Sequence, residues 1–304
     1  MSNAKLAQLT REASDKGGVT VLRELLRFLR KEKVRRPDIC LEYGPRLLQN
    51  RRGLGDEVWV IYEQMATAAM DAGDLLVAEA NVSNLRQKFP SSQRVRQLEG
   101  MLAEARGQFA AAEVIYKGMV EANPANQLAR KRQVAVLIAQ GEAVAAVKAL
   151  NGYLSDFAAD SEAWLQLAKL HVDALNYEAA AFCYEELVLV APSDHLVHCR
   201  LAEVYYTMGG VDNLMRARKH FSQSVDLLKT GNARALHGLC QACASLAAHK
   251  SSSRVLGQGK EKAINEALHL FAGKELRRAY GGAGNSELTS LVDDMLGAQS
   301  SVML

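Results

Sequence analysis

Residues 161–194 read SEAWLQLAKL HVDALNYEAA AFCYEELVLV APSD. Apolar side chains return within this stretch every three or four residues, at Trp164, Leu167 and Ala168, with His171 on the same face, and again at Tyr177, Ala180, Tyr184 and Leu187. That spacing is typical of one face of an α-helix. Pro192 then ends the second helical pattern, because proline lacks a backbone donor and clashes inside a helix. The stretch therefore predicts two helices joined by a turn.

The same pattern extends in both directions with a period of 34 residues. Glycine, alanine and proline each return at this interval, in the series Gly73, Gly107 and Gly141; Ala78, Ala112, Ala146 and Ala180; and Pro90, Pro124 and Pro192. In the glycine series, Leu175 stands where the next glycine would be, and Gly209 lies two periods beyond Gly141. In the proline series, Ala158 stands between Pro124 and Pro192. Three residue types that share one period indicate an internal repeat.

Each repeated residue has a physical role in a two-helix unit. The glycine closes the first helix, where a left-handed backbone conformation favours a residue without a Cβ. The alanine comes early in the second helix, where a larger side chain would hold the two helices apart. Trp164 adds an aromatic packing residue to the first helix of residues 161–194. The sequence therefore predicts an all-α chain of stacked helical hairpins.

This arrangement resembles the tetratricopeptide repeat, a helix–turn–helix of 34 residues. Copies are predicted to start at Trp59, Gln93, Gln127, Ser161 and His195, and the fifth carries about three extra residues in its turn at Gly209-Gly210-Val211. We expect three parts: an N-terminal helical cap (1–58), five repeats (59–231), and a degenerate repeat with an insertion loop and C-terminal helices (232–304). The resemblance implies a superhelical solenoid with helical caps.

The two ends are predicted to differ from the repeats. Residues 20–34 are predicted to form a basic amphipathic helix, which either caps the first repeat with its charges in solvent, or lies on an anionic membrane surface or meets an acidic partner. Ser251 to Lys262 is read as a loop, Ala263 to Ala279 as a helix, and Glu287 to Leu296 as a short last helix.

Composition excludes several classes of protein. The chain is 49% hydrophobic and its formal net charge is only +3, which argues against a general nucleic-acid binder. No secretory signal and no uninterrupted apolar stretch of about 18 residues occurs. We therefore expect a soluble chain that reaches a membrane only through partners.

No catalytic, metal or cofactor site is predicted. Cys240 and Cys243 form an isolated CxxC whose two residues share one helical face, and we interpret them as core residues. His195 and His198 lack a third ligand nearby. Residues 257–260 read GQGK, but the preceding strand and the other residues of a phosphate loop are missing. No nucleophile elbow occurs, so we expect no enzyme activity.

A solenoid of this type binds proteins along a surface formed by the first helices of its repeats. By repeat phase, the candidate partner-binding residues are Arg94, Gln97, Lys131, Arg132, Lys169 and Tyr206. Some co-chaperones grip a partner's terminal carboxylate with Lys and Asn at two set phases. At those phases this chain has Glu63 with Thr67, Gln97 with Met101, and Lys131 with Ala135. The clamp is absent.

Several segments resemble one particular family. They are VIYEQ (60–64), ARKR (129–132), LNGYL (150–154), SEAW (161–164), AAFCYEEL (180–187) and AEVYYTMGG (202–210). In this order and spacing they are similar to the family of second subunits of the endoplasmic reticulum membrane protein complex, over roughly residues 56–228.

The resemblance implies a cytosolic, peripheral scaffold in a complex that inserts tail-anchored and multi-pass proteins into the endoplasmic reticulum membrane. Its partners would be the other subunits, including a soluble one of the paired 8/9 type, with no cofactor and no nucleic acid. Two alternatives remain: a soluble co-chaperone adaptor, and an RNA-processing helical-repeat protein.

Overall fold

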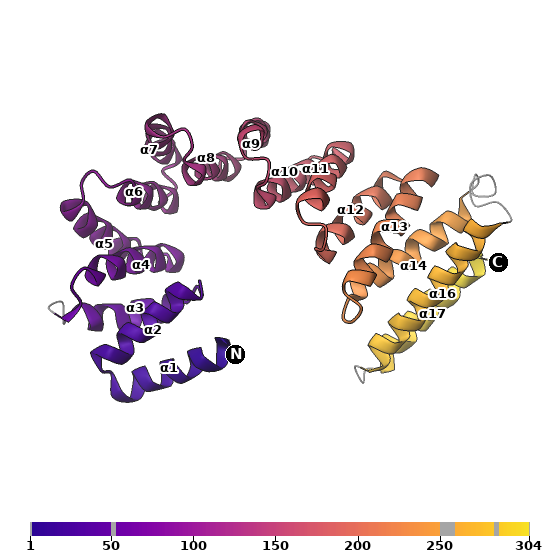
Figure 1. The fold of residues 1–304 in the computed structure, drawn as a ribbon, viewed down its shortest axis with the longest axis horizontal. Helices are drawn as coiled ribbons and strands as arrows, with labels where there is room; N and C mark the ends of the chain where they lie inside the picture. The colour runs from indigo at the N-terminus through magenta and orange to yellow at the C-terminus, as the bar shows by residue number, and fades with distance from the viewer. Residues whose placement is uncertain (1, 50–52, 250–258, 283–285, 304) are drawn as a thin grey trace. The chain divides into compact units, whose positions relative to one another are not determined.

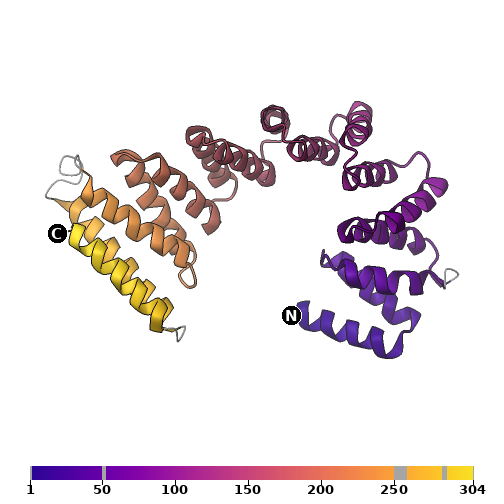
Figure 2. The same ribbon diagram turned by 180° about the vertical axis from the view of Figure 1, so that it is seen from behind.

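The computed structural model describes residues 2–49, 53–249, 259–282 and 286–303, and every element within these ranges is helical. The all-α prediction is confirmed. The chain divides into two compact units, residues 1–146 and 147–304, and each is described by itself. Figure 1 labels the helices, and Figure 2 gives the view from behind.

Unit 1 contains three N-terminal helices followed by helical hairpins. Its helices are α1 (Ser2–Lys16), α2 (Val19–Lys31), α3 (Pro37–Leu48), α4 (Glu57–Ala72), α5 (Leu75–Lys88), α6 (Gln93–Ala105), α7 (Phe109–Ala122) and α8 (Gln127–Ala139). Each packs against the next in the chain from α1 to α8. The next helix, α9 (Ala143–Asp156), contains the division between the units.

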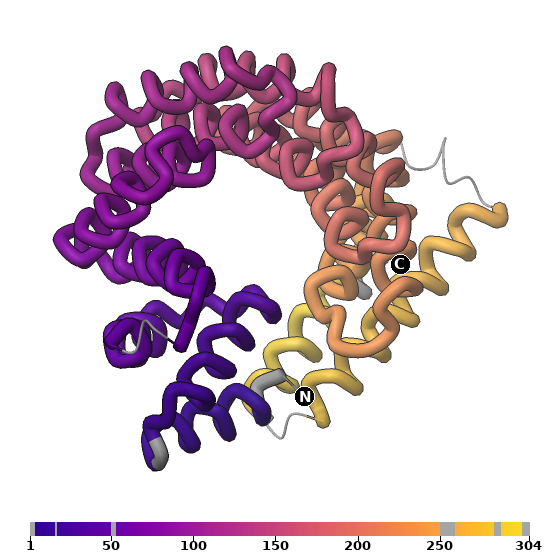
Figure 3. The backbone as a smooth tube through the Cα atoms, turned by 60° about the vertical axis from the view of Figure 1, so that its left-hand side comes forward, coloured from indigo at the N-terminus to yellow at the C-terminus, as the bar shows by residue number. Residues whose placement is uncertain are grey.

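Unit 2 continues the hairpins and ends in two long helices. Its helices are α10 (Ser161–Asp173), α11 (Tyr177–Val190), α12 (His195–Met208), α13 (Val211–Leu227), α14 (Ala233–Ala248), α16 (Lys260–Gly281) and α17 (Ser286–Met303). α14 packs against α13, α16 and α17, so the last helices stack on the final repeat (Figure 3).

The repeated residues occupy special backbone and packing positions. Gly73, Gly107 and Gly141 have φ values of 77°, 71° and 80°, in the left-handed region. Leu175 takes the same conformation in the fourth repeat, with a φ of 58°. Ala78, Ala112, Ala146 and Ala180 are all 0% exposed. The small side chains thus lie inside the hairpins, while Trp164 is half-buried and donates from Nε1 to the Ala158 carbonyl at 2.8 Å.

Polar caps start several first and second helices. The side chains of Asp74, Asn126, Asp160 and Asn176 each accept a hydrogen bond from the backbone amide three residues later. Each bond satisfies an amide that has no partner within the helix. These caps fix where α5, α8, α10 and α11 begin.

The fifth hairpin differs from the prediction of an enlarged turn. Only Gly209 and Gly210 separate α12 from α13, whereas three residues separate α10 from α11. In the preceding repeats the second helix begins three residues before its buried alanine, but α13 begins six residues before Ala217. The extra residues form an additional helical turn at the start of α13.

The terminal helices also differ in extent from the predictions. α16 begins at Lys260 instead of Ala263, and α17 runs from Ser286 to Met303 instead of Glu287 to Leu296. Residues 250–258, which contain most of the predicted insertion loop and part of the GQGK segment, lie outside the described residues. Within the described ranges, no helix combines the length and the apolar character needed to cross a bilayer.

Candidate functional site

The six predicted partner-binding residues fall on four first helices in two units. Arg94 and Gln97 lie on α6, Lys131 and Arg132 on α8, Lys169 on α10, and Tyr206 on α12. No cavity described in either unit is lined by more than one of them. Arg94 alone among the six lines a described cavity of unit 1.

Two cavities meet at α4 and together form what we call the α4 groove. The first, the basic pocket, measures about 420 Å³ and lies among α2, α3, α4 and α6; its lining includes Arg30, Lys33, Arg35, Arg36 and Arg94. The second, the aromatic pocket, measures about 410 Å³ and is lined by residues that include Trp59, Phe89 and Leu98. Val60, Glu63 and Arg94 line both.

Ion pairs fix the arginines of the basic pocket. Arg35 holds Asp71 through two hydrogen bonds, at 2.7 and 3.1 Å. Arg94 donates to Glu63 Oε2 at 2.7 Å, which ties α6 to α4 at the point where the two pockets meet. Such exposed pairs stabilise the fold little. Their effect here is to hold the guanidinium groups in place around the cavity.

Glu57, at the start of α4, receives three arginines from α2. Arg23, Arg27 and Arg30 all bind its carboxylate, which is 12% exposed, and Arg30 also donates to Gln64 Oε1 at 2.6 Å. Burial raises the pKa of Glu57, but hydrogen bonds from Arg27 and Arg23 outweigh that effect and hold the pKa below its ordinary value. The prediction that the charges of this helix stay in solvent holds for Arg27, which is exposed, whereas Arg23 and Arg30 are half-buried against Glu57.

The aromatic pocket is built on Trp59. Its ring meets Phe89 edge-on at 5.5 Å between centroids and stacks with Tyr62 at 5.9 Å. Lys88 Nζ lies 5.7 Å from the Trp59 centroid. Phe89 is 37% exposed and Val60 36% exposed. The pocket therefore presents accessible apolar surface beside the cations of the first cavity.

Three other predicted residues make contacts within their own neighbourhoods. Arg132 pairs with Glu104 at 3.3 Å, and Glu104 in turn accepts from the hydroxyl of Tyr116. Burial, together with that hydrogen bond, raises the pKa of Tyr116. Gln97 Nε2 lies 3.8 Å from the sulfur of Met101 on its own helix, and the half-buried Lys131 is also engaged with neighbours.

In unit 2, Lys169 is exposed on α10, and Tyr206 joins two helices. The Tyr206 hydroxyl lies 3.2 Å from Gln241 Oε1 and 3.0 Å from Ser245 Oγ, both on α14. Tyr206 therefore contributes to packing between α12 and α14. Trp164 meets Phe182 edge-on at 6.2 Å, across the α10–α11 hairpin.

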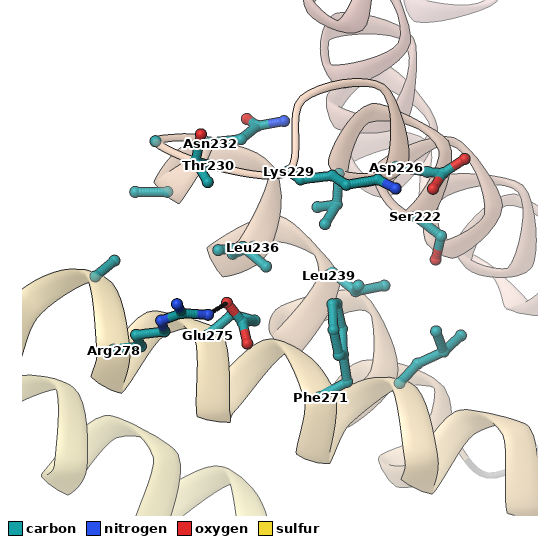
Figure 4. Close-up of a pocket in the computed structure, with 15 residues that line it drawn as sticks. Ser222, Asp226, Lys229, Thr230, Asn232, Leu236, Leu239, Phe271, Glu275 and Arg278 are labelled. Atoms are coloured by element: carbon teal, nitrogen blue, oxygen red, sulfur yellow. Dashed lines mark ion pairs between the residues drawn. The ribbon is translucent and has the colours of Figure 1, made fainter.

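Unit 2 has a cavity of its own between α13, α14 and α16, of about 670 Å³. Figure 4 shows Phe271 of α16 pointing toward Leu239, below the segment that carries Lys229 and Asn232. Arg278 and Glu275 pair on α16, at 3.8 Å. The cavity has an apolar floor and charges of both signs at its rim.

The two cysteines of the CxxC motif are buried in unit 2. Cys240 and Cys243 are 0% exposed, and burial raises the pKa of each thiol to about 12. A thiol of that pKa is protonated at neutral pH and is a poor nucleophile. In the described part of the chain no three His, Cys, Asp or Glu residues gather closely enough to hold a metal ion.

Sequence reasoning missed most of the α4 groove. It identified Arg94 from its position in the repeat, and Lys33 as part of the basic helix, but it did not single out Glu57 or Phe89. The only available signal was a surplus of arginines in residues 23–36 facing few carboxylates. The predicted cap placed this basic helix beside the first repeat, but the sequence did not show which carboxylates its arginines would meet.

Comparison with known proteins gives the family. Residues 75–227 match the family described as EMC2 TPR-like repeat domain. The chain is 38% identical over 281 residues to ER membrane protein complex subunit 2 of Xenopus tropicalis, covering 90% of this chain and 93% of that protein. The chain belongs to the ER membrane protein complex subunit 2 family.

Other relatives agree with this membership and with the fold. The subunit 2 protein of Dictyostelium discoideum is 34% identical over 210 residues, covering 68% of this chain and 65% of that protein. The crystal structure of the C-terminal part of a TPR repeat-containing protein from Cytophaga hutchinsonii superposes with a TM-score of 0.55 at 11% identity, covering 93% of this chain and 97% of that one. That likeness supports the tetratricopeptide-type fold.

Proposed function

We propose that this member of the ER membrane protein complex subunit 2 family is a non-catalytic scaffold on the cytoplasmic face of the endoplasmic reticulum membrane. It would organise the cytosolic ends of membrane-embedded subunits that insert tail-anchored and multi-pass proteins. The observation that carries this proposal is the match to named complex subunits over nine-tenths of the chain. Its attachment to the membrane would be peripheral, through those partners.

The described surface supports a role in protein binding. The α4 groove combines fixed cations with accessible aromatic side chains, and the cavity of unit 2 adds a second apolar recess. Aromatic residues and arginines are the side chains that dominate protein interfaces. We expect one of these surfaces to receive a soluble subunit of the 8/9 type. The predicted residues Arg94, Gln97, Lys131, Arg132, Lys169 and Tyr206 remain candidates for such contacts.

The co-chaperone alternative is disfavoured by one specific contact. A clamp for a C-terminal carboxylate needs a cation at the phase of Glu63, but this position places a carboxylate in the groove, where Arg94 already binds it. The terminal carboxylate of a chaperone tail would therefore lack its cationic partner at the first position of the clamp.

Affinity purification tests the proposal. The tagged full-length chain is isolated from detergent-solubilised cells of its own source, with an unrelated tetratricopeptide protein as the control bait. We expect multi-pass membrane proteins to be recovered in a fixed ratio to the bait. Recovery of soluble chaperones alone, together with saturable binding of a C-terminal chaperone peptide, would establish the adaptor role instead.

A further inference from the structure

The lining of the basic pocket has an excess of positive charge. Five cations, Arg30, Lys33, Arg35, Arg36 and Arg94, face two carboxylates, those of Glu63 and Asp71. The lining by itself therefore has a formal charge of +3, although two of its arginines, Arg30 and Arg36, pair with Glu57 and Asp38 outside the lining. Such a concentration at one concave site raises the local concentration of anionic groups.

Lys33 is the cation of this lining that has no ion-pair partner among the described residues. The other four are bound to carboxylates at 2.6–2.8 Å, namely those of Glu57, Asp71, Asp38 and Glu63. Leu29, Val34 and Val60 provide apolar wall beside Lys33. The pocket can therefore accept a carboxylate without breaking an existing pair.

The backbone of Lys33 is in a conformation that lysine rarely adopts. Its φ is 53°, directly after the end of α2, where the amide of Val34 donates to the Leu29 carbonyl at 3.0 Å and the amide of Lys33 to the Arg30 carbonyl at 3.3 Å. These two bonds form the helix-ending motif whose left-handed position usually holds glycine. A strained non-glycine residue at a cavity suggests a function that offsets its cost.

We propose that the α4 groove binds a linear peptide segment of a partner protein, with acidic side chains in the basic pocket and a bulky apolar side chain against Trp59 and Phe89. The proposal rests on the scaffold function above and names the chemistry of one of its partners. Charge complementarity selects the acidic part of the segment. Because both pockets are lined by Val60, Glu63 and Arg94, they are adjacent, and one peptide segment can reach both.

A peptide fits these observations better than a nucleic acid or a lipid surface. Most of the arginines are already paired, so few free cations remain to neutralise a row of phosphates. The aromatic pocket is concave and apolar, which suits a single side chain. The same binding assay with a single-stranded RNA and with anionic vesicles separates these ligands, and tighter binding of either one would overturn the proposal.

The direct test measures binding to the full-length chain by fluorescence anisotropy. The probes are labelled peptides in which a run of glutamates precedes or follows a Leu-Phe pair, with matched peptides that carry glutamine in place of glutamate. We expect the better glutamate peptide to bind at least about tenfold more tightly than its glutamine match, and the difference to shrink between about 50 and 300 mM NaCl. Equal affinity of the glutamate and glutamine peptides would overturn the proposal.

Lys33→Gly separates binding from folding. Glycine relieves the strained backbone, so we expect an unchanged or slightly higher Tm, by about 1–3 °C, and binding that is about three- to fivefold weaker. The matched control is Leu175→Gly, which relieves the other non-glycine residue with a positive φ in the described ranges and lies in unit 2. It should change Tm similarly and leave peptide affinity unchanged. Equal affinity of the Lys33→Gly variant and the wild-type chain would exclude Lys33 from the site.

Phe89→Ala tests the aromatic half of the site against Val114→Ala. Phe89 is 37% exposed in the aromatic pocket, and Val114 is 73% exposed on α7, outside both pockets. We expect only Phe89→Ala to weaken the peptide, by about fivefold or more. Recovery of membrane subunits without any peptide binding would reject this inference alone, whereas loss of that recovery would reject the scaffold function itself.

Discussion

Gly100 allows the ring of Tyr116 to lie directly against the backbone of α6. A Cβ at this position would be 2.6 Å from two ring carbons, which is too close for any side chain. The ring cannot move away easily, because Tyr116 is 0% exposed and its hydroxyl binds Glu104. Small residues at such positions set how closely paired helices approach.

Gly100→Ala should therefore destabilise the chain by about 1–3 kcal/mol, because the new methyl group overpacks the α6–α7 hairpin. Urea unfolding followed by circular dichroism measures the change. The control is Gly118→Ala on α7, where a Cβ meets nothing within 4 Å. That change should stabilise the helix by up to about 1 kcal/mol. Equal effects of the two substitutions would show that the close approach is wrong.

His220 gives the α12–α13 hairpin a dependence on pH. His198 Nε2 lies 3.0 Å from the Pro192 carbonyl and must donate to it, so His198 Nδ1 accepts from His220 Nδ1, 3.1 Å away. Protons on both facing Nδ1 atoms would break this contact, so the two rings cannot both be charged in the folded chain. Burial lowers the pKa of His220 to about 4, and the charges of His198, Lys219 and Arg216 act in the same direction against the weaker opposite effect of Glu185.

Because the pKa of His220 is lower in the folded chain than in the unfolded chain, acid should destabilise the fold. Stability from a neutral His220 is fully present above its unfolded pKa of about 6.5 and is lost as pH falls from there toward 4. We expect a loss of about 1–2 kcal/mol over that window, after allowance for partial exposure of the ring. The His220→Gln variant should lose this pH dependence of stability. The free energy of unfolding of the wild-type chain and that of the variant, both measured from pH 7 to pH 4, should therefore become more similar as the pH falls. A constant difference would contradict the assigned protonation.

The conformations of some single residues could be predicted from the sequence, and those of others could not. Gly73, Gly107 and Gly141 were expected in a left-handed turn, and their φ values lie there. Lys33 and Leu175 share that conformation, but neither residue type signals it. Gly100 gave no signal either, since its role depends on which ring of α7 faces it. Conformations that a residue type favours can be read from sequence, whereas those imposed by neighbours cannot.

The element most dependent on charge is α2. Its leucines Leu22, Leu25, Leu26 and Leu29 are buried, and three of its arginines converge on Glu57 of α4. Because three arginines of α2 bind one carboxylate of α4, the ion pairs fix the rotation of α2 relative to α4. Without the carboxylate, three cations would repel one another at a partly buried site.

Glu57→Gln should consequently loosen α2, with a cost of about 1–2 kcal/mol. Hydrogen exchange should show faster exchange in α2 than in the wild-type chain, while α12 and α13 stay unchanged. Glu42→Gln is the matched control, because Glu42 makes only an exposed pair with Arg46 at 3.4 Å, and its effect should stay within about 0.5 kcal/mol. Unaltered exchange in α2 would mean that its leucines alone hold it.

The positions of the hairpins were more predictable than their exact lengths. Four predicted repeat starts coincide with the first residues of α6, α8, α10 and α12, because the period of apolar residues and the polar caps agree there. The additional turn of α13 was not predicted. Spacing shows that three residues are inserted near Gly209, but it cannot show whether they extend the turn or the helix.

For the whole chain, the α4 groove shows why a repeat pattern predicts a fold better than a site. Its basic pocket joins α2 and α3 of the cap to α4 and α6 of the first two hairpins. The pattern predicts how hairpins stack, since each contacts its neighbours in the same way. The packing of the cap follows no period, so the cations that it contributes could not be placed from the sequence.

The stacking of neighbours also limits how far damage spreads. Ala180 of α11 is 0% exposed, and α11 packs against α10 and α12. Ala180→Leu should overfill the hairpin and cost about 1–3 kcal/mol. Because each repeat contacts only its neighbours, hydrogen exchange should accelerate in α10 to α13 but not in α2 to α6. The control is Ala267→Leu, at an exposed position of α16. It should change neither the free energy of unfolding nor the hydrogen exchange of these helices. If Ala180→Leu melted like the wild-type chain, α10 and α11 would not pair through this alanine, and if exchange accelerated equally in α2 to α6, the chain would unfold as one cooperative body instead of by neighbouring repeats.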